Sequence, residues 1–235
     1  MSGTLIIPGD TIELGTESGE TSIGPGITTN PKDQSIVYPS TAGLLKSISK
    51  RNKTIAYIEH NTKRYIPTIH DYVVGVVITV FGDGYRVSLA NYSQPVVLSA
   101  LGFPNATKKN RPHLKVGDVV YAIVSLVDRD VEVEIECIDP VTGKEGGFGQ
   151  LNGGTLFDVK LAYARYLLFN SNAEILEAIV NKCQFEIAIG SNGKIWINTE
   201  NVKTTVAAMN AIVESQQWKK EEIVKNVNKI FKDVL

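Results

Sequence analysis

The chain has 235 residues, of which 43% are hydrophobic, and a formal net charge of −1 at pH 7. These values predict a folded chain with one large domain or two to three small ones, and they argue against a protein whose whole surface coats nucleic acid. The sequence has no run approaching the roughly eighteen apolar residues of a membrane helix, no signal-like N-terminus and only two distant cysteines, so we expect an intracellular protein without a disulfide framework.

The first segment, residues 1–64, combines short β-prone runs at 5–7 and 55–58 with frequent Gly and Pro. This pattern predicts a small N-terminal all-β domain with many turns, which we interpret as a docking domain. No acid occurs between residues 34 and 58, and the basic residues of this stretch are candidates for weaker RNA contacts: Lys46, Lys50, Arg51 and Lys53. A solvated loop without a ligand explains these charges equally well.

The second segment, residues 65–150, contains five β-prone runs, at 72–81, 85–91, 94–99, 119–127 and 131–138. Strands at this spacing predict a β-barrel of the oligonucleotide-binding (OB) type. In the last run, apolar residues alternate with Glu132, Glu134 and Glu136. One face of this strand should therefore be acidic and repel RNA.

The strongest candidate for RNA contact lies in the connection between the third and fourth strands of this barrel. No acid occurs between residues 84 and 117, and Lys108, Lys109 and Arg111 lie together between two prolines. Such side chains contact phosphates without reading bases. Arg86 extends this candidate surface, and a solvated loop whose charges aid solubility is the alternative interpretation.

Four aromatic residues lie on or beside the expected barrel strands: Phe81, Tyr85, Tyr92 and Phe103. Aromatic rings of OB folds stack on single-stranded bases, but small barrels also need large interior side chains. We assign these residues to the barrel core, and we expect Tyr92 to be the exposed one and to contact RNA.

The third segment, residues 151–235, follows the order strand, helix, helix, strand, strand, helix, which predicts a KH domain. Asp158, Asn172 and Thr199 are the expected N-caps of the three helices. Apolar residues at helical spacing after residue 222 predict a final amphipathic helix. The expected helices cover 159–169, 173–181 and 200–217, and the expected strands cover 184–189 and 194–198.

The sequence Gly190-Ser191-Asn192-Gly193 has the Gly-x-x-Gly spacing with which KH domains clamp backbone nucleotides. The clamp joins the first two helices of a KH domain, whereas this sequence joins two expected strands. We therefore interpret Gly190, Asn192 and Gly193 as a structural hairpin turn, with Ser191 and Asn192 exposed.

A nuclease would need converging acids, bases or metal ligands. The three histidines do not approach metal-ligand spacing, and the acids between residues 128 and 136 are expected to face solvent on and beside one strand. The sequence therefore predicts no catalytic residue, no metal site and no cofactor.

Several short motifs are spread over nearly the whole chain: Pro8-Gly9-Asp10, Gly24-Pro25-Gly26-Ile27, Lys63-Arg64-Tyr65-Ile66-Pro67, the segment from Phe103 to Pro112, Val116-Gly117-Asp118, Gly147-Phe148-Gly149 and the segment from Gly190 to Trp196. In this order and spacing they resemble the non-catalytic cap subunits of the eukaryotic RNA exosome. The resemblance implies an N-terminal β domain, an OB barrel of the ribosomal S1 type and a C-terminal KH domain.

The same resemblance implies a function and partners. A protein of this kind helps to guide RNA into a ring of RNase PH-like subunits, beside other cap subunits, and supports rRNA processing and 3′-to-5′ RNA degradation without cutting RNA itself. It binds no membrane and is expected in the nucleus and nucleolus and also in the cytoplasm. The alternatives are a free-standing RNA-binding adaptor in ribosome assembly or translation and, with less support, a metal-dependent RNase.

Overall fold

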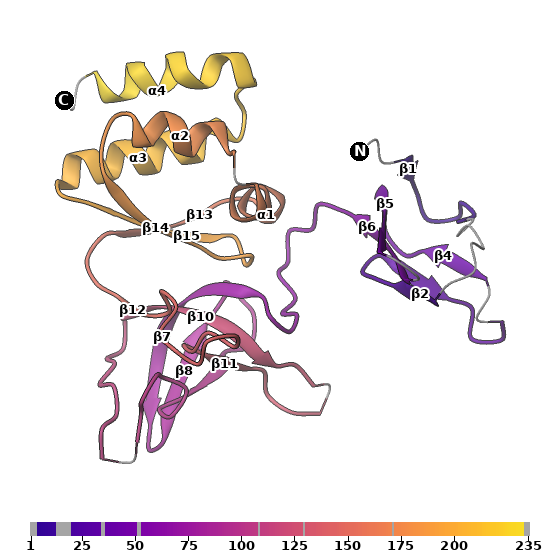
Figure 1. The fold of residues 1–235 in the computed structure, drawn as a ribbon, viewed down its shortest axis with the longest axis horizontal. Coiled ribbons are helices and arrows are strands. Elements are labelled where there is room, and N and C mark those ends of the chain that lie inside the picture. The colour runs from indigo at the N-terminus through magenta and orange to yellow at the C-terminus, as the bar shows by residue number, and fades with distance from the viewer. Residues whose placement is uncertain are drawn as a thin grey trace. The chain divides into compact units, whose positions relative to one another are not determined.

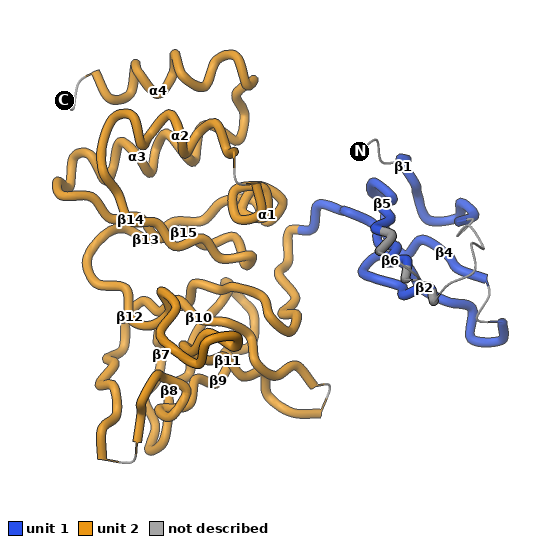
Figure 2. The backbone as a smooth tube through the Cα atoms, viewed as in Figure 1, with its two compact units in different colours: residues 1–62 blue, residues 63–235 orange. Residues whose placement is uncertain are grey.

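The computed structural model describes residues 4–12, 20–33, 36–50, 53–107, 109–128, 130–170 and 172–232. The chain divides into two compact units, residues 1–62 and residues 63–235, which Figure 2 shows in blue and orange. Each unit is described by itself below. Within the described ranges, no helix is both long enough and apolar enough to cross a membrane.

The first unit is built from short strands. Four of them form a sheet of order β1-β5-β6-β2, in which β2 runs parallel to β6 and the other pairs are antiparallel. β3 and β4 pair as a separate ribbon. Ile6, Ile27 and Ile58 are among the few buried side chains of a small core. The strands are β1 Thr4–Ile6, β2 Glu20–Ile23, β3 Ile27–Thr29, β4 Val37–Pro39, β5 Gly43–Lys50 and β6 Lys53–Glu59.

The second unit begins with a closed barrel (Figure 1). β7 to β11 pair in the order β11-β9-β8-β7-β10, and β11 also pairs with β10, which closes the sheet into the predicted OB barrel. β11 runs parallel to β9, and β12 is added to β10. The alternation of apolar and polar residues places Val73, Val77 and Val87 in the barrel interior. The strands are β7 Tyr72–Phe81, β8 Gly84–Ser88, β9 Val96–Ser99, β10 Val119–Leu126, β11 Glu134–Glu136 and β12 Gly149–Leu151.

The second unit ends with the predicted KH domain. Its three strands form an antiparallel sheet of order β13-β15-β14, and its helices cover one face of that sheet (Figure 1). A short 3-10 turn, η1, leads into the final amphipathic helix, which packs on α2 and α3. The elements are β13 Thr155–Asp158, α1 Leu161–Phe169, α2 Glu174–Val180, β14 Phe185–Ile189, β15 Lys194–Thr199, α3 Val202–Ser215, η1 Lys220–Glu222 and α4 Ile223–Phe231.

None of the three residues predicted as N-caps holds that position, because each helix begins one or two residues later than expected. Asn201 caps α3 by accepting a hydrogen bond from the backbone N–H two residues later, whereas Lys160 and Ala173 precede the other helices without a side-chain cap. Asp158 instead forms an ion pair with Lys194, at 2.9 Å.

The KH sheet packs on the helices with one face and on the barrel with the other. On β15, Ile195 and Ile197 lie in the helix-covered core, whereas Trp196 packs with Val74 of β7 and Ala188 of β14. Successive side chains of a strand point to opposite faces, so this apolar strand is buried on both sides. The barrel and the KH domain therefore share a continuous apolar joint.

The turn between β14 and β15 inserts polar groups into this joint. The Asn192 side chain donates hydrogen bonds from Nδ2 to the carbonyl oxygens of Val74, at 2.8 Å, and Leu89, at 2.6 Å, and its Oδ1 accepts one from the Val74 N–H, at 3.2 Å. The Ser191 hydroxyl donates to the Tyr72 carbonyl at 2.9 Å. Ser191 and Asn192 are only 6% and 5% exposed, so the expectation that they face solvent is wrong.

Backbone geometry fixes the same turn. The Gly193 N–H donates to the Gly190 carbonyl at 3.0 Å, and Gly193 has a φ of +82°. A Cβ atom at Gly193 would lie 2.8 Å from the Val159 carbonyl oxygen, and one at Gly190 would lie 2.7 Å from the Val74 nitrogen. Glycine is thus required at both positions, because a side chain there would collide with neighbouring backbone. The barrel backbone lies against this turn and leaves no space for a nucleotide.

Candidate nucleic-acid interface

The connection between β9 and β10 carries a basic loop, which we define as residues 104–112. Its tip is a tight turn in which the Thr107 and Asn110 backbones exchange hydrogen bonds at 2.9 and 3.1 Å. Lys109 lies in this turn and is exposed, whereas Lys108 lies outside the described residues. The turn therefore presents at least the Lys109 ammonium group to solvent.

Arg111 fixes the basic loop to the turn between β7 and β8. Its Nη1 donates hydrogen bonds to the Asp83 Oδ1, at 2.8 Å, and to the Gly82 carbonyl, at 3.2 Å. At the end of the loop, the buried Tyr85 hydroxyl donates to the carbonyl of Pro112. These contacts hold residues 111 and 112 of the loop against the β7–β8 hairpin.

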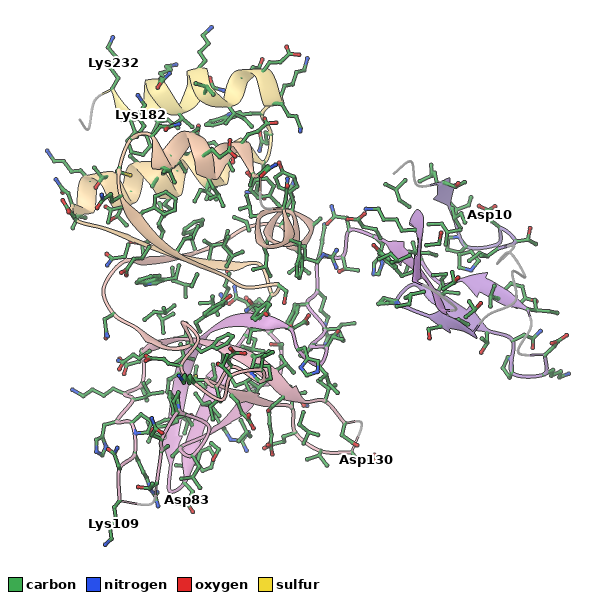
Figure 3. The ribbon with its side chains drawn as sticks, in the orientation of Figure 1. Asp10, Asp83, Lys109, Asp130, Lys182 and Lys232 are labelled. Atoms are coloured by element: carbon green, nitrogen blue, oxygen red, sulfur yellow. The ribbon has the colours of Figure 1, made fainter. Side chains whose placement is uncertain are left out.

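The charges described at the end of the barrel that bears this loop are of both signs. Asp83 is the acid that contacts the loop, and Arg111 pairs with it. Within the described part of the chain, no ion pair joins Lys109 or the exposed Lys115 to an acid. Figure 3 shows Lys109 and Asp83 together at one end of the barrel, away from the KH helices. Exposed ammonium groups of this kind suit phosphate contacts that do not depend on base sequence.

Arg86 pairs with an acid outside the basic loop. It faces outward from β8, and its Nη2 lies 3.0 Å from the Glu132 Oε1 in the connection between β10 and β11. Glu134, two residues after Glu132 at the start of β11, is also exposed. Glu132 thus neutralises Arg86, and a phosphate would have to displace Glu132 to reach the guanidinium group.

Tyr92 lies at the other end of the barrel. β8 leads away from the β7–β8 turn to the loop at 89–95, where the Leu89 carbonyl accepts the hydrogen bond from Asn192 of the KH domain. The Tyr92 side chain is fully exposed, and its backbone has a φ of +63°. The structure therefore does not bring Tyr92 together with Lys109 and Arg111.

The other aromatic residues of the barrel follow the core prediction except for one. Tyr85 is buried and Phe103 is partly buried against the barrel core. Phe81 is 43% exposed, so its assignment to the core is wrong. It is the last residue of β7, directly before the turn that Arg111 contacts, and a strand position next to Gly82-Asp83-Gly84 is the sequence signal that marks it as a rim residue.

Lys46 is the basic candidate of the first unit whose side chain the structure describes, and it lies on the outer face of the sheet. Lys46 of β5 forms an ion pair with Glu59 of β6. The backbones of Lys50 and Lys53 pair at the end of this hairpin, but their side chains and all of Arg51 lie outside the described residues. The described part of this candidate site thus contains one lysine, whose charge is already compensated.

The same outer face carries exposed apolar side chains. Strand pairing places Leu5 beside Leu44 and Ile48 beside Ile55, on the face opposite the small core. Leu5 is 71% exposed, and the other three are between 39% and 41% exposed. An exposed apolar face of this kind is typical of a surface that docks on another protein.

The described residues offer no assembled catalytic group. No three His, Cys, Asp or Glu side chains among them gather into a metal-binding cluster. Asp128 accepts a hydrogen bond from the Asp130 N–H at 2.8 Å. Burial raises the pKa of the Cys137 thiol to about 12, so this thiol remains protonated and poorly nucleophilic at neutral pH.

A partly buried carboxylate lies next to the joint between barrel and KH domain. The Asp71 Oδ2 accepts hydrogen bonds from the Tyr65 hydroxyl, at 2.7 Å, and from the Thr68 N–H, at 3.1 Å. Burial raises the pKa of Asp71, and the two hydrogen bonds oppose this rise. Ionisation of Asp71 therefore destabilises the folded state.

Three family models match consecutive parts of the chain. They are described as the Rrp40 N-terminal domain of an exosome complex exonuclease, over residues 21–64, the S1 domain of exosome complex component RRP40, over residues 65–149, and the KH domain, over residues 154–203. The matches follow the order of the first unit, the barrel and the KH domain.

Curated proteins match almost the whole chain. The exosome complex component RRP40 of Saccharomyces cerevisiae is 43% identical over 98% of this chain and 93% of its own length. The Schizosaccharomyces pombe protein of the same name is 39% identical over 96% and 93%, and that of Drosophila melanogaster is 35% identical over 92% and 90%. A solved structure titled as an exosome complex RNA-binding protein is 22% identical, covers 74% of this chain and 100% of its own, and has a TM-score of 0.58, which supports the fold alone.

Proposed function

This chain belongs to the family of exosome complex component RRP40, and from that premise we propose that it is a non-catalytic RNA-binding cap subunit of an RNA exosome whose barrel offers the basic loop to RNA. The observation that carries this proposal is the exposed Lys109 on a loop that Arg111 ties to the barrel. The subunit helps to guide RNA for processing and 3′-to-5′ degradation, and it does not cut RNA itself.

Guidance at this end of the barrel is electrostatic. Lys109 attracts phosphates of any sequence. Arg111 contributes mainly by holding the loop, because its guanidinium group is engaged by Asp83. Lys108 is adjacent in the sequence and is proposed to contact phosphates as well.

The other parts of the chain are proposed to dock on neighbouring subunits. The exposed apolar face of the N-terminal sheet fits a protein surface better than it fits RNA, since it is apolar and its described lysine is paired. RNase PH-like ring subunits and other cap subunits are the proposed partners. The proposed locations are the nucleus and nucleolus and also the cytoplasm.

Replacement of Lys109 with glutamate tests the proposed RNA surface. In the complex reconstituted with its partner subunits, Lys109→Glu should weaken RNA binding and reduce the slope of log affinity against log salt by about 0.7 for each phosphate that the protein no longer neutralises. Lys225→Glu is a matched control, because Lys225 is an exposed lysine on α4, far along the chain from the barrel. Equal affinities and slopes for both variants would exclude the basic loop as the RNA surface.

Co-purification and an RNA degradation assay test the remaining parts of the proposal. A cap subunit should co-purify in stoichiometric amounts with ring subunits, whereas a free-standing adaptor should not. The purified chain should leave RNA intact in the presence of magnesium, manganese or zinc. Cleavage that Asp128→Asn and Asp130→Asn abolish would support a metal-dependent RNase instead.

A further inference from the structure

Two Asn-Gly pairs occur in the sequence, Asn152-Gly153 and Asn192-Gly193. In such a pair the backbone nitrogen of the glycine attacks the side-chain amide carbon of the asparagine, because glycine has no Cβ atom to hinder the approach. The nitrogen loses its proton, ammonia leaves and a five-membered succinimide ring closes. Water then opens the ring at either carbonyl and gives aspartate or isoaspartate. The structure places the two pairs in opposite surroundings.

The Asn152-Gly153 pair is open to this reaction. Asn152 is exposed between β12 and β13, in the segment that joins the barrel to the KH domain. Gly153 and Gly154 have φ values of +69° and +64°, which take them out of both neighbouring strands. Among the hydrogen bonds between described residues, none involves the Asn152 side-chain amide or the Gly153 N–H. No bond of this kind therefore has to break before the nitrogen attacks.

The Asn192-Gly193 pair is closed to the same reaction. Three hydrogen bonds to the backbone of Val74 and Leu89 hold the Asn192 amide, and the Gly193 N–H donates to the Gly190 carbonyl at 3.0 Å. Ring closure would have to break all four. Asn192 is only 5% exposed, so the joint also excludes the water that opens the ring.

We propose that Asn152 is a site of spontaneous deamidation, which converts it to aspartate and isoaspartate in the folded protein, and that the joint between barrel and KH domain protects Asn192 from the same reaction. Water is the co-reactant and ammonia is the leaving group, and no oxidation or reduction takes place. The inference goes beyond the proposed function and does not depend on RNA binding.

Isoaspartate at position 152 would disturb the joint through Trp196. It adds a negative charge and inserts one methylene group into the main chain directly before Gly153, whose carbonyl accepts a hydrogen bond from the Trp196 Nε1 at 2.9 Å. The next residue has no room to compensate, since a Cβ atom at Gly154 would lie 2.5 Å from the Ile197 carbonyl oxygen. The longer main chain therefore displaces the Gly153 carbonyl from the indole N–H.

The test follows both pairs in the full chain during incubation at mildly alkaline pH. Trypsin separates them into the peptides 145–160 and 183–194. In the folded chain, peptide 145–160 should gain about 1 Da and become a substrate for an isoaspartyl methyltransferase. Peptide 183–194 should convert at least about 30-fold more slowly, the factor that corresponds to about 2 kcal/mol of opening free energy. In urea, where the joint is absent, the two peptides should convert at similar rates.

Variants identify the reacting residue. Asn152→Gln keeps the amide but would need a six-membered ring, so it should abolish the methylation of peptide 145–160. Asn210→Gln is the matched control, because Asn210 is exposed on α3 and is followed by alanine, and it should leave this methylation unchanged. An unchanged mass of peptide 145–160, or equal methylation of Asn152→Gln and the parent, would overturn the assignment of Asn152. Equal rates for the two peptides in the folded chain would overturn the protection of Asn192.

Nuclear magnetic resonance tests the effect on the joint. The indole N–H signal of Trp196 should shift in chains that contain isoaspartate at position 152, because the Gly153 carbonyl has moved. Asn152→Asp, which adds the charge without the extra methylene group, should leave this signal in place. A signal that is the same in the isoaspartate form and the parent would show that the modification does not reach the joint.

Discussion

Removal of the Asn192 side chain should uncouple the barrel from the KH domain. Asn192 is 5% exposed and makes three hydrogen bonds to barrel backbone, two through Nδ2 and one through Oδ1. A hydrogen bond contributes about 0.5–1.5 kcal/mol net, and a buried group left without a partner costs about 1–3 kcal/mol. We therefore expect Asn192→Ala to lower the free energy of unfolding of the second unit by about 2–4 kcal/mol. The upper part of this range applies if no water reaches the backbone groups of Val74 and Leu89 that lose their partner.

A second substitution at the same position tests the cause of this destabilisation. Asn192→Asp keeps the size of the side chain and the acceptor for the Val74 N–H, but it turns a carboxylate oxygen toward the Val74 and Leu89 carbonyls. Repulsion between these oxygens should make Asn192→Asp at least as destabilising as Asn192→Ala. Asn228→Ala, at an exposed position of α4, is the control and should change stability by less than about 0.5 kcal/mol.

Urea unfolding followed by tryptophan fluorescence measures these differences. Trp196 is 4% exposed and packs with Val74 at the joint, so its emission reports separation of barrel and KH domain. If Asn192→Ala unfolds at the same urea concentration as Asn228→Ala, the three hydrogen bonds add nothing to the joint and the argument fails. A destabilisation confined to Asn192→Ala, with Asn192→Asp unchanged, would contradict the assignment of the Nδ2 donors.

Three further predictions concern the same joint. Gly193→Val should lower the free energy of unfolding by at least about 1–3 kcal/mol in thermal melts, because Gly193 has a φ of +82° and a Cβ atom there would lie 2.8 Å from the Val159 carbonyl; an unchanged melting temperature would contradict it. Ser191→Asp should also melt at a lower temperature, since Ser191 is buried and its hydroxyl donates to the Tyr72 carbonyl; parental stability would mean that the turn is exposed. Burial raises the pKa of Asp71, so the free energy of unfolding of the parent, relative to that of Asp71→Asn, should fall as the pH rises from about 3 to about 6. A difference in free energy of unfolding that stays constant or grows over this range would show that Asp71 is not desolvated.

The fold was predictable because periodicity reports local structure. The run at residues 72–81 coincides with β7, and the helix–helix–strand–strand–helix order after residue 159 matches α1 to α3. Helix starts were less accurate, because tertiary packing and not capping propensity alone decides where a helix begins, and α1 and α2 begin without a side-chain cap. At α3, for example, Thr199 and Asn201 are both suitable N-cap residues, and only the structure shows that Asn201 is used.

The candidate site was predictable only in part, because charge patterns do not report spatial neighbours. The acid-free stretch between residues 84 and 117 contains Arg86, Tyr92 and Lys109, yet Arg86 pairs with Glu132 and Tyr92 lies at the other end of the barrel from Lys109. Glu132, which neutralises Arg86, is 46 residues away in the sequence. The exposure of Phe81 likewise depends on where the barrel ends, and strand alternation gives no information on that.

The two ends of the barrel have different roles for a physical reason. At one end, the turn between β14 and β15, which has the spacing of a nucleotide clamp, is buried in the joint. Asn192 and Ser191 donate their side-chain hydrogen bonds to barrel carbonyls there. A polar group that is already bonded inside a dry joint cannot also bind a phosphate without breaking the fold. The RNA contact that we propose lies at the opposite end, where Lys109 is exposed on the loop that Arg111 joins to the β7–β8 turn. The KH domain then acts by holding the barrel, and variants of the joint should alter RNA binding only to the extent that they unfold the chain.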